Sequence, residues 1–185
     1  MDRQSQGQVC RPHPHHYAAG RPAPRRLATQ FVEVTIHTDG ACLGNPGPGG
    51  YGVILDYDGR RKELSGGYAL TTNNRMELLA AIVGLEALNR PCQVTLHSDS
   101  RYVVDAVSKG WAAKWRQNGW MRNKREAAVN PDLWERLLNL LERHDARFHW
   151  VRGHSGNPDN ERCDALATTA ARQPNLPDDP GYRLK

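Results

Sequence analysis

The sequence predicts an α/β domain in which a mixed sheet carries helices on its faces. Three observations predict this class. Two stretches near the start have the composition of strands and are joined by the hairpin signal Asp58-Gly59. Leucines recur at helical spacing in the middle of the chain. Beyond residue 70, helical and extended patterns alternate.

The first expected strand covers residues 32–38, where β-branched side chains at alternate positions suit a pleated sheet. It is followed at once by Asp39. Gly40 then permits a sharp turn, and the glycine- and proline-rich stretch 44–50 is expected to continue neither a strand nor a helix. A carboxylate therefore sits beside a loop whose backbone can approach a ligand, although Asp-Gly is equally typical of a plain surface turn.

The second and third strands are expected at 51–57 and 61–68, which completes an antiparallel meander. The later elements are expected to be helix, strand, helix, helix, strand and helix, at 75–89, 93–98, 100–108, 131–144, 147–151 and 158–172. The first of these helices can be capped by Thr72, Asn73 or Asn74. Asn130-Pro131-Asp132 is a strong helix start, because it supplies a cap, a proline at the first position and an acid in the first turn.

The segment 109–125 differs from the rest of the chain in its charge. It contains no acid, and three tryptophans lie among its basic side chains, which are Lys109, Lys114, Arg116, Arg122, Lys124 and Arg125. Such a cluster is typical of a surface that contacts nucleic-acid phosphates. The tryptophans have a simpler interpretation, which is packing of the segment onto the domain.

The net charge of +5 is unevenly placed, because residues 1–30 hold five arginines and one acid. The remaining chain is nearly neutral, so the overall charge is weak support for nucleic-acid binding by the folded part. No apolar run approaches the roughly 20 residues of a membrane span. The four cysteines show no paired spacing, which favours free thiols. We therefore expect a cytoplasmic protein with no membrane partner.

Three regions are expected along the chain. Residues 1–30 are rich in Arg, Pro and His and have the composition of a disordered extension. Residues 31–173 form the folded domain, and the Pro- and Asp-rich tail 174–185 is expected to be loose. We expect a monomer.

Four acids are candidates for a shared site. Asp39 and Asp99 follow strands, Glu77 lies in the first turn of a helix, and Asp164 has small and apolar neighbours in the last helix. Ligands gather at the carboxyl ends of strands in open α/β sheets, so these acids can converge there. Clustered like charges need cations, and oxygen ligands without paired His or Cys suit Mg²⁺ or Mn²⁺ rather than Zn²⁺. Taken singly, each acid is more simply a turn former or a helix-face charge.

Five motifs then occur in order between residues 31 and 185. They are TDG at 38–40 with CLGNPG at 42–47, TNNRMEL at 72–78, SDS at 98–100, WVRGH at 150–154 and NERCD at 160–164. Together they resemble the type 1 ribonucleases H of the bacterial, single-domain kind. The resemblance implies a ribonuclease H-like sheet of five strands, a three-strand antiparallel meander plus two parallel strands. It also implies an endonuclease that hydrolyses the RNA strand of RNA–DNA hybrids and leaves 5′-phosphate and 3′-hydroxyl ends.

By position, the resemblance implies that Asp39, Glu77, Asp99 and Asp164 are the catalytic acids. They would bind two Mg²⁺ ions when substrate is present, with Mn²⁺ as a substitute. His154 would assist proton transfer or product release, which suits an imidazole near its ordinary pKa.

The resemblance also implies two substrate-binding regions. A strip that meets 2′-hydroxyls, minor-groove edges and a DNA phosphate would consist of Cys42, Gly44, Asn45, Thr72, Asn73 and Asn74. Segment 109–125 corresponds to the family's basic handle, which grips the DNA strand through residues matching Trp111, Lys114, Trp115 and Arg116. Arg101 stands where relatives often carry a neutral polar residue, and it either contacts the substrate or faces solvent.

Two other functions remain open at this point. One is a catalytically weak module that binds hybrids or double-stranded RNA, which would usually lack one of the acids. The other is a different nuclease of the same fold, such as a resolvase or transposase domain. The handle and the Asn73-Asn74-Arg75-Met76-Glu77 run argue against the latter.

Overall fold

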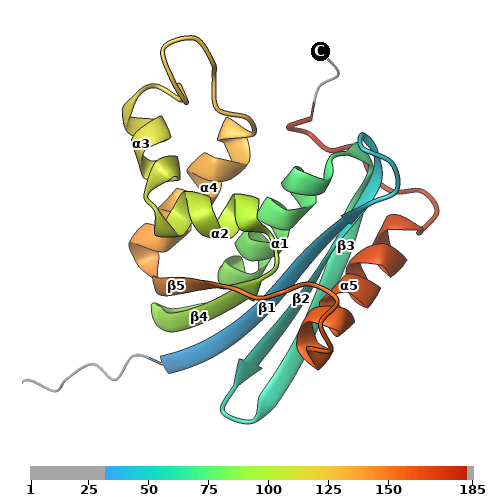
Figure 1. Cartoon of the computed structure of the whole chain (residues 1–185). Coiled ribbons are helices and arrows are strands. Elements are labelled where there is room, and N and C mark those ends of the chain that lie inside the picture. Colours follow the sequence, from blue (N-terminus) through green and yellow to red (C-terminus); the bar gives the residue numbers. More distant parts are fainter. Residues whose placement is uncertain (1–31, 183–185) are drawn as a thin grey trace, which may run out of the picture. The chain divides into compact units, whose positions relative to one another are not determined.

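The computed structural model describes residues 32–182. The expected extension at 1–30 lies outside the described residues. Within them, one sheet has the strand order β3-β2-β1-β4-β5 (Figure 1). Its strands are β1 Val32–Cys42, β2 Gly47–Tyr57, β3 Arg60–Thr71, β4 Cys92–Ser98 and β5 Asp145–Trp150. The helices are α1 Asn73–Glu86, α2 Arg101–Ser108, α3 Trp111–Gln117, α4 Pro131–Arg143 and α5 Pro158–Ala171.

The predicted mixed sheet is confirmed. β1, β2 and β3 pair antiparallel, while β4 pairs parallel with β1 and with β5. Asp58 and Gly59 both have positive φ at the β2–β3 turn, which is the geometry of a tight hairpin. Parallel neighbours need long connections. The one from β1 to β4 contains β2, β3 and α1, and the one from β4 to β5 contains α2, α3 and α4.

Helices cover both faces of the sheet (Figure 1). α1 packs on one face, where Ile36, Val53 and Leu96 are fully buried. α5 lies on the other face, against β1, β2 and β3. α4 packs on α1, and Trp134 is fully buried there. Burying one large apolar side chain contributes about 1.5–3 kcal/mol, so these layers supply most of the favourable free energy of folding.

One expectation about the glycine-rich stretch is wrong. β1 continues to Cys42, and β2 already begins at Gly47, so residues 47–50 are part of a strand rather than a loop. Neighbouring strands on both sides stabilise this part of β2. Its Gly49 pairs with Cys42 of β1, and its Gly47 pairs with Thr71 of β3. The glycines also allow α5 to approach, because a Cβ at Gly50 would meet the backbone of that helix.

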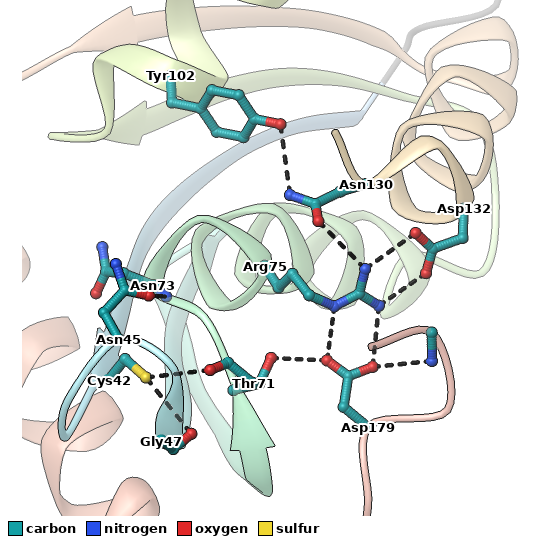
Figure 2. Close-up of polar contacts among 11 residues, drawn as sticks. Cys42, Asn45, Gly47, Thr71, Asn73, Arg75, Tyr102, Asn130, Asp132 and Asp179 are labelled. Atoms are coloured by element: carbon teal, nitrogen blue, oxygen red, sulfur yellow. Dashed lines mark hydrogen bonds and ion pairs between the residues drawn. The ribbon is translucent and has the colours of Figure 1, made fainter. Parts of the chain in front are cut away.

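The C-terminal tail also differs from its expectation, as far as residue 182. Asp179 is buried and accepts hydrogen bonds from the Arg75 guanidinium at 2.7 and 2.9 Å and from Thr71 Oγ1 at 2.7 Å (Figure 2). Arg75 also pairs with Asp132 at 2.7 Å. The tail is therefore tied to the end of β3 and to the first turns of α1 and α4, instead of being loose.

No helix among residues 32–182 is both long and apolar enough to cross a membrane.

Candidate active site

Asp39 and Asp99 lie side by side because of the register between two parallel strands. Thr38 of β1 is opposite Ser98, the last residue of β4. An aspartate follows each of these two residues in the sequence. Gly40 N–H donates to Asp39 Oδ1 at 2.7 Å. The sheet thus places two carboxylates at the point where β4 ends beside β1.

Glu77 is brought to the same point by α1. The backbone of Glu77 lies so close to Gly40 that a Cβ at Gly40 would collide with it. Glu77 is buried, and its Oε1 accepts a hydrogen bond from Asn73 Nδ2 at 3.5 Å, one turn earlier in the helix. Close packing of α1 on β1 therefore delivers the third acid.

The carboxylates of Asp39, Glu77 and Asp99 form one group, with a ligand oxygen of each within 4.8 Å of the others. Burial raises the pKa of Asp39 to about 8, and the charges of Asp99 and Asp164 add to this. Burial also raises the pKa of Glu77 well above its ordinary value, with further contributions from Asp39 and Asp99. Both shifts have the same physical origin, which is negative charge confined in a poorly solvated place.

This group fits a divalent cation. Its donors are carboxylate oxygens, which Mg²⁺ and Mn²⁺ prefer. Glu77 Oε2 is buried and has no hydrogen-bond partner among the described residues, so one lone-pair-bearing atom is free to act as a ligand. A cation here would offset both the cost of burying the charges and their mutual repulsion, which together raise the two pKa values.

Asp164 and His154 lie outside this group of three. Asp164 is half-buried on α5, where Thr168 Oγ1 donates to its Oδ1 at 3.2 Å, and its charge acts on Asp39. His154 is exposed and has a positive φ of 49° in the loop between β5 and α5. The preceding Gly153 lies against the Asp99 carboxylate. The loop that carries His154 is thus anchored beside the acids.

The residues of the expected substrate strip lie near one another. Asn45 Oδ1 accepts a hydrogen bond from the Asn73 backbone N–H at 3.2 Å, which joins the β1–β2 loop to the start of α1 (Figure 2). Cys42 Sγ lies 3.5 Å from the carbonyl oxygens of Gly47 and Thr71. Gly44 and Asn74 are exposed, and Thr72 is half-buried as the N-cap of α1.

The handle, residues 109–125, contains α3, a short helix that the sequence did not predict. Trp115 packs edge-on against Trp134 with ring centroids 5.7 Å apart, which confirms a structural role for that tryptophan. Trp111 is 44% exposed and lies under Lys109 Nζ. Lys114 is exposed, whereas Arg116 pairs with Glu142 of α4 at 2.8 Å.

Arg101 is held at the rim of the acid group. Its guanidinium carbon lies 3.8 Å from the ring centroid of Trp150, a cation–π contact. Trp150 Nε1 donates to the backbone carbonyl of Asp99 at 3.0 Å. Arg101 is exposed, so a positive charge faces solvent next to the site.

A second group of possible metal ligands consists of His37, Asp56 and Asp159. Arg61 already lies on it, 2.6 Å from Asp159 and 3.5 Å from Asp56. We interpret this group as an ion-pair network between the β2–β3 hairpin and α5, since the guanidinium supplies the neutralising charge.

Asn160 is a residue whose role the sequence did not reveal. It is buried, and its Nδ2 donates to Asp99 Oδ2 at 3.1 Å. One signal could have identified it, because Asn160 stands four residues before Asp164 and therefore on the same face of a helix.

A sheet in the order β3-β2-β1-β4-β5 with acids gathered beside its central strands defines a ribonuclease H-like fold. The family model described as RNase H matches residues 32–172. A ribonuclease H from Desulforamulus reducens is 67% identical over 149 residues, which are 80% of this chain and 94% of that protein. The chain belongs to the ribonuclease H family, and it is an enzyme of that class.

Solved structures agree with this membership. LC9-RNase H1, described as a type 1 RNase H with the type 2 active-site motif, has a TM-score of 0.68 and 35% identity, over 76% of this chain and 72% of that chain. LC11-RNase H1, crystallised in complex with RNA/DNA hybrid, has a TM-score of 0.58 and 25% identity, over 75% of this chain and 96% of that chain.

Proposed function

We propose that the enzyme hydrolyses the RNA strand of RNA–DNA hybrids at the group formed by Asp39, Glu77 and Asp99, with Asp164 beside it. The observation that carries this proposal is the presence of three carboxylates within 4.8 Å of one another in a chain of the ribonuclease H family. The hybrid found with LC11-RNase H1 supports the substrate class.

The four acids would hold divalent ions, Mg²⁺ or Mn²⁺ by their oxygen donors, and two ions when the hybrid is bound. Such ions supply the charge that stabilises the attacking and leaving oxygens of a phosphate displacement. The protein contributes the arrangement. The parallel register fixes Asp39 next to Asp99, packing of α1 on Gly40 fixes Glu77, and α5 presents Asp164.

His154 is proposed to hold or transfer a proton at the leaving side of the site. It is exposed on a loop whose neighbouring Gly153 contacts Asp99, so the loop holds the imidazole next to the acids. The expected products carry 5′-phosphate and 3′-hydroxyl ends.

The hybrid is proposed to lie across the strip formed by Cys42, Gly44, Asn45, Thr72, Asn73 and Asn74. Backbone groups and short polar side chains there can both donate to and accept from 2′-hydroxyls, which only the RNA strand carries. The hydrogen bond between Asn45 and Asn73 holds the two halves of the strip together. Recognition of this kind needs no particular base sequence.

The handle is proposed to contact the DNA strand. Lys114 is exposed and free to reach a phosphate, while Trp111 offers an exposed face to the backbone. Arg116 is a weaker candidate because it already pairs with Glu142. Arg101, stacked on Trp150, is proposed to contact a phosphate close to the acids. One chain holds all of these parts, so we propose that it acts as a monomer.

The test uses one end-labelled sequence as an RNA–DNA hybrid and as an RNA duplex, each with Mg²⁺ and with EDTA. We expect cuts in the RNA strand of the hybrid in Mg²⁺ alone, with 5′-phosphate ends. Binding of the hybrid without cutting in Mg²⁺ or Mn²⁺ would support the binding module instead. The complete set of acids favours the enzyme.

A further inference from the structure

Asn160 contacts the acid group directly, through a buried hydrogen bond. It is 4% exposed, and its Nδ2 lies 3.1 Å from Asp99 Oδ2. The donor must be the amide nitrogen, because a carboxamide oxygen facing a carboxylate would be repulsive. Asp99 therefore has one oxygen fixed by a neutral donor from a different element.

The same pattern occurs at all three carboxylates of the group. Asp39 Oδ1 accepts from the Gly40 amide, Glu77 Oε1 from the Asn73 side chain, and Asp99 Oδ2 from Asn160. Each carboxylate thus has one oxygen held by a neutral N–H, which fixes the plane of the group and leaves the other oxygen available as a ligand.

Asp99 depends more than the others on a distant partner. The Asp39 and Glu77 donors lie one and four residues away, whereas Asn160 is 61 residues away on α5. Two further residues, Trp150 and Gly153, lie next to Asp99, but neither donates a hydrogen bond to its carboxylate. Trp150 Nε1 binds its backbone carbonyl, and the absence of a Cβ at Gly153 leaves room for its carboxylate.

We propose that Asn160 is a positioning residue that holds the Asp99 carboxylate in the orientation needed to share a divalent cation with Asp39 and Glu77. The inference rests on the proposed function. Because Asn160 and Asp164 lie on one face of α5, the same contact also sets where that helix presents Asp164 to the group. Asn160 acts on the site through its hydrogen bond to Asp99.

The test is a titration with Mg²⁺ alone, without hybrid, followed through the NMR amide shifts of Gly40 and Gly153. Asn160→Ala removes the donor, and Asn160→Leu removes it while keeping the approximate size of the side chain and adding no charge. We expect both variants to need about 10–100 times more Mg²⁺ than the wild type for half-saturation, which is the usual effect of losing a partner of a metal ligand. The same increase is expected in the Mg²⁺ dependence of hybrid cleavage.

Two controls make the outcome decisive. Asn157→Ala removes the cap that accepts from the Asp159 and Asn160 amides, so it weakens the same helix without removing the donor to Asp99. A Mg²⁺ midpoint that moves equally in the Asn157 and Asn160 variants, or in neither, would overturn the positioning role. Asp99→Asn tests the proposed function itself. If that variant binds Mg²⁺ and cuts hybrid like the wild type, the site assignment fails, whatever Asn160 does.

Discussion

Asp39 is a carboxyl group whose burial is costly at neutral pH. Its pKa is raised to about 8 by burial first and by the charges of Asp99 and Asp164 second. A carboxyl with a raised folded-state pKa favours the folded state fully below the unfolded-state pKa near 4, and this contribution is lost as the pH rises toward 8. Asp39 and Glu77, whose pKa values are both raised, are therefore expected to destabilise the metal-free protein at pH 7.

This gives a prediction for Asp39→Asn. In EDTA at pH 7, we expect the variant to be more stable than the wild type by about 1–3 kcal/mol, because the amide cannot ionise. At pH 4 the difference should shrink toward zero, and saturating Mg²⁺ should reduce it at pH 7. Urea unfolding at both pH values measures it. A variant that is less stable than the wild type at pH 7 in EDTA would contradict the electrostatic cost.

At the scale of elements, the C-terminal tail is joined to α1 and α4 by an ion-pair cluster in which Arg75 and Asp179 are buried and Asp132 is exposed (Figure 2). Burial alone would raise the pKa of Asp179, but hydrogen bonds from Arg75 and Thr71 outweigh it and lower the pKa. Arg75 lies two residues before Glu77, so the cluster also steadies the start of the helix that carries this proposed metal ligand.

We expect Asp179→Asn to destabilise the protein by about 2–4 kcal/mol at pH 7, because Arg75 loses a buried charged partner. A lowered folded-state pKa gives stability that is present above the unfolded-state pKa near 4 and is lost as the pH falls through the folded-state value. Wild type and variant should therefore begin to converge below about pH 4 and become equal only below the lowered folded-state pKa of Asp179. The matched control is Asp178→Asn at the exposed neighbouring position. Equal stability of the two variants at pH 7 would show that the cluster contributes little.

The handle is an element whose charge can be tested separately from the acids. Lys114, Lys124 and Arg125 are exposed. Replacing all three with Gln should weaken hybrid binding and lower the slope of log K against log salt by about 2–3, since each phosphate contact contributes about 0.9 at most. Arg60→Gln, at the exposed first residue of β3, is the control. A salt slope that stays unchanged in the triple variant would exclude the handle from phosphate binding.

At the scale of the whole molecule, the sequence predicted what local signals encode. Alternation, the Asp58-Gly59 turn and the Asn130-Pro131-Asp132 start each depend on a few neighbouring residues, and the structure has the hairpin and a helix that begins at Pro131 with Asp132 in its first turn. The expected cap is wrong, because the Asn130 side chain makes no capping hydrogen bond and its Oδ1 accepts from Arg75 instead. The motifs predict four acids, of which the structure brings Asp39, Glu77 and Asp99 together, and the parallel register explains why two of them meet.

What the sequence missed depends on distant partners. Residues 47–50 belong to β2 because they pair with β1 on one side and β3 on the other, and because Gly50 leaves room for α5 to pack closely. Asp179 is buried because Arg75, 104 residues away, pairs with it, and Asn160 meets Asp99 across 61 residues. No local pattern encodes such contacts, so a polar residue in a tail or a helix has the same appearance in the sequence whether or not it is buried.

The most direct measurement is cleavage of a labelled RNA–DNA hybrid in Mg²⁺ by the wild type and by Asp39→Asn, with hybrid binding measured for both. If the acids act through divalent ions, the wild type should cut the RNA strand, and the variant should lose cutting by a factor of about 10³ or more while still binding the hybrid. Equal cutting by the two proteins, or binding without cutting by the wild type, would contradict the proposed active site.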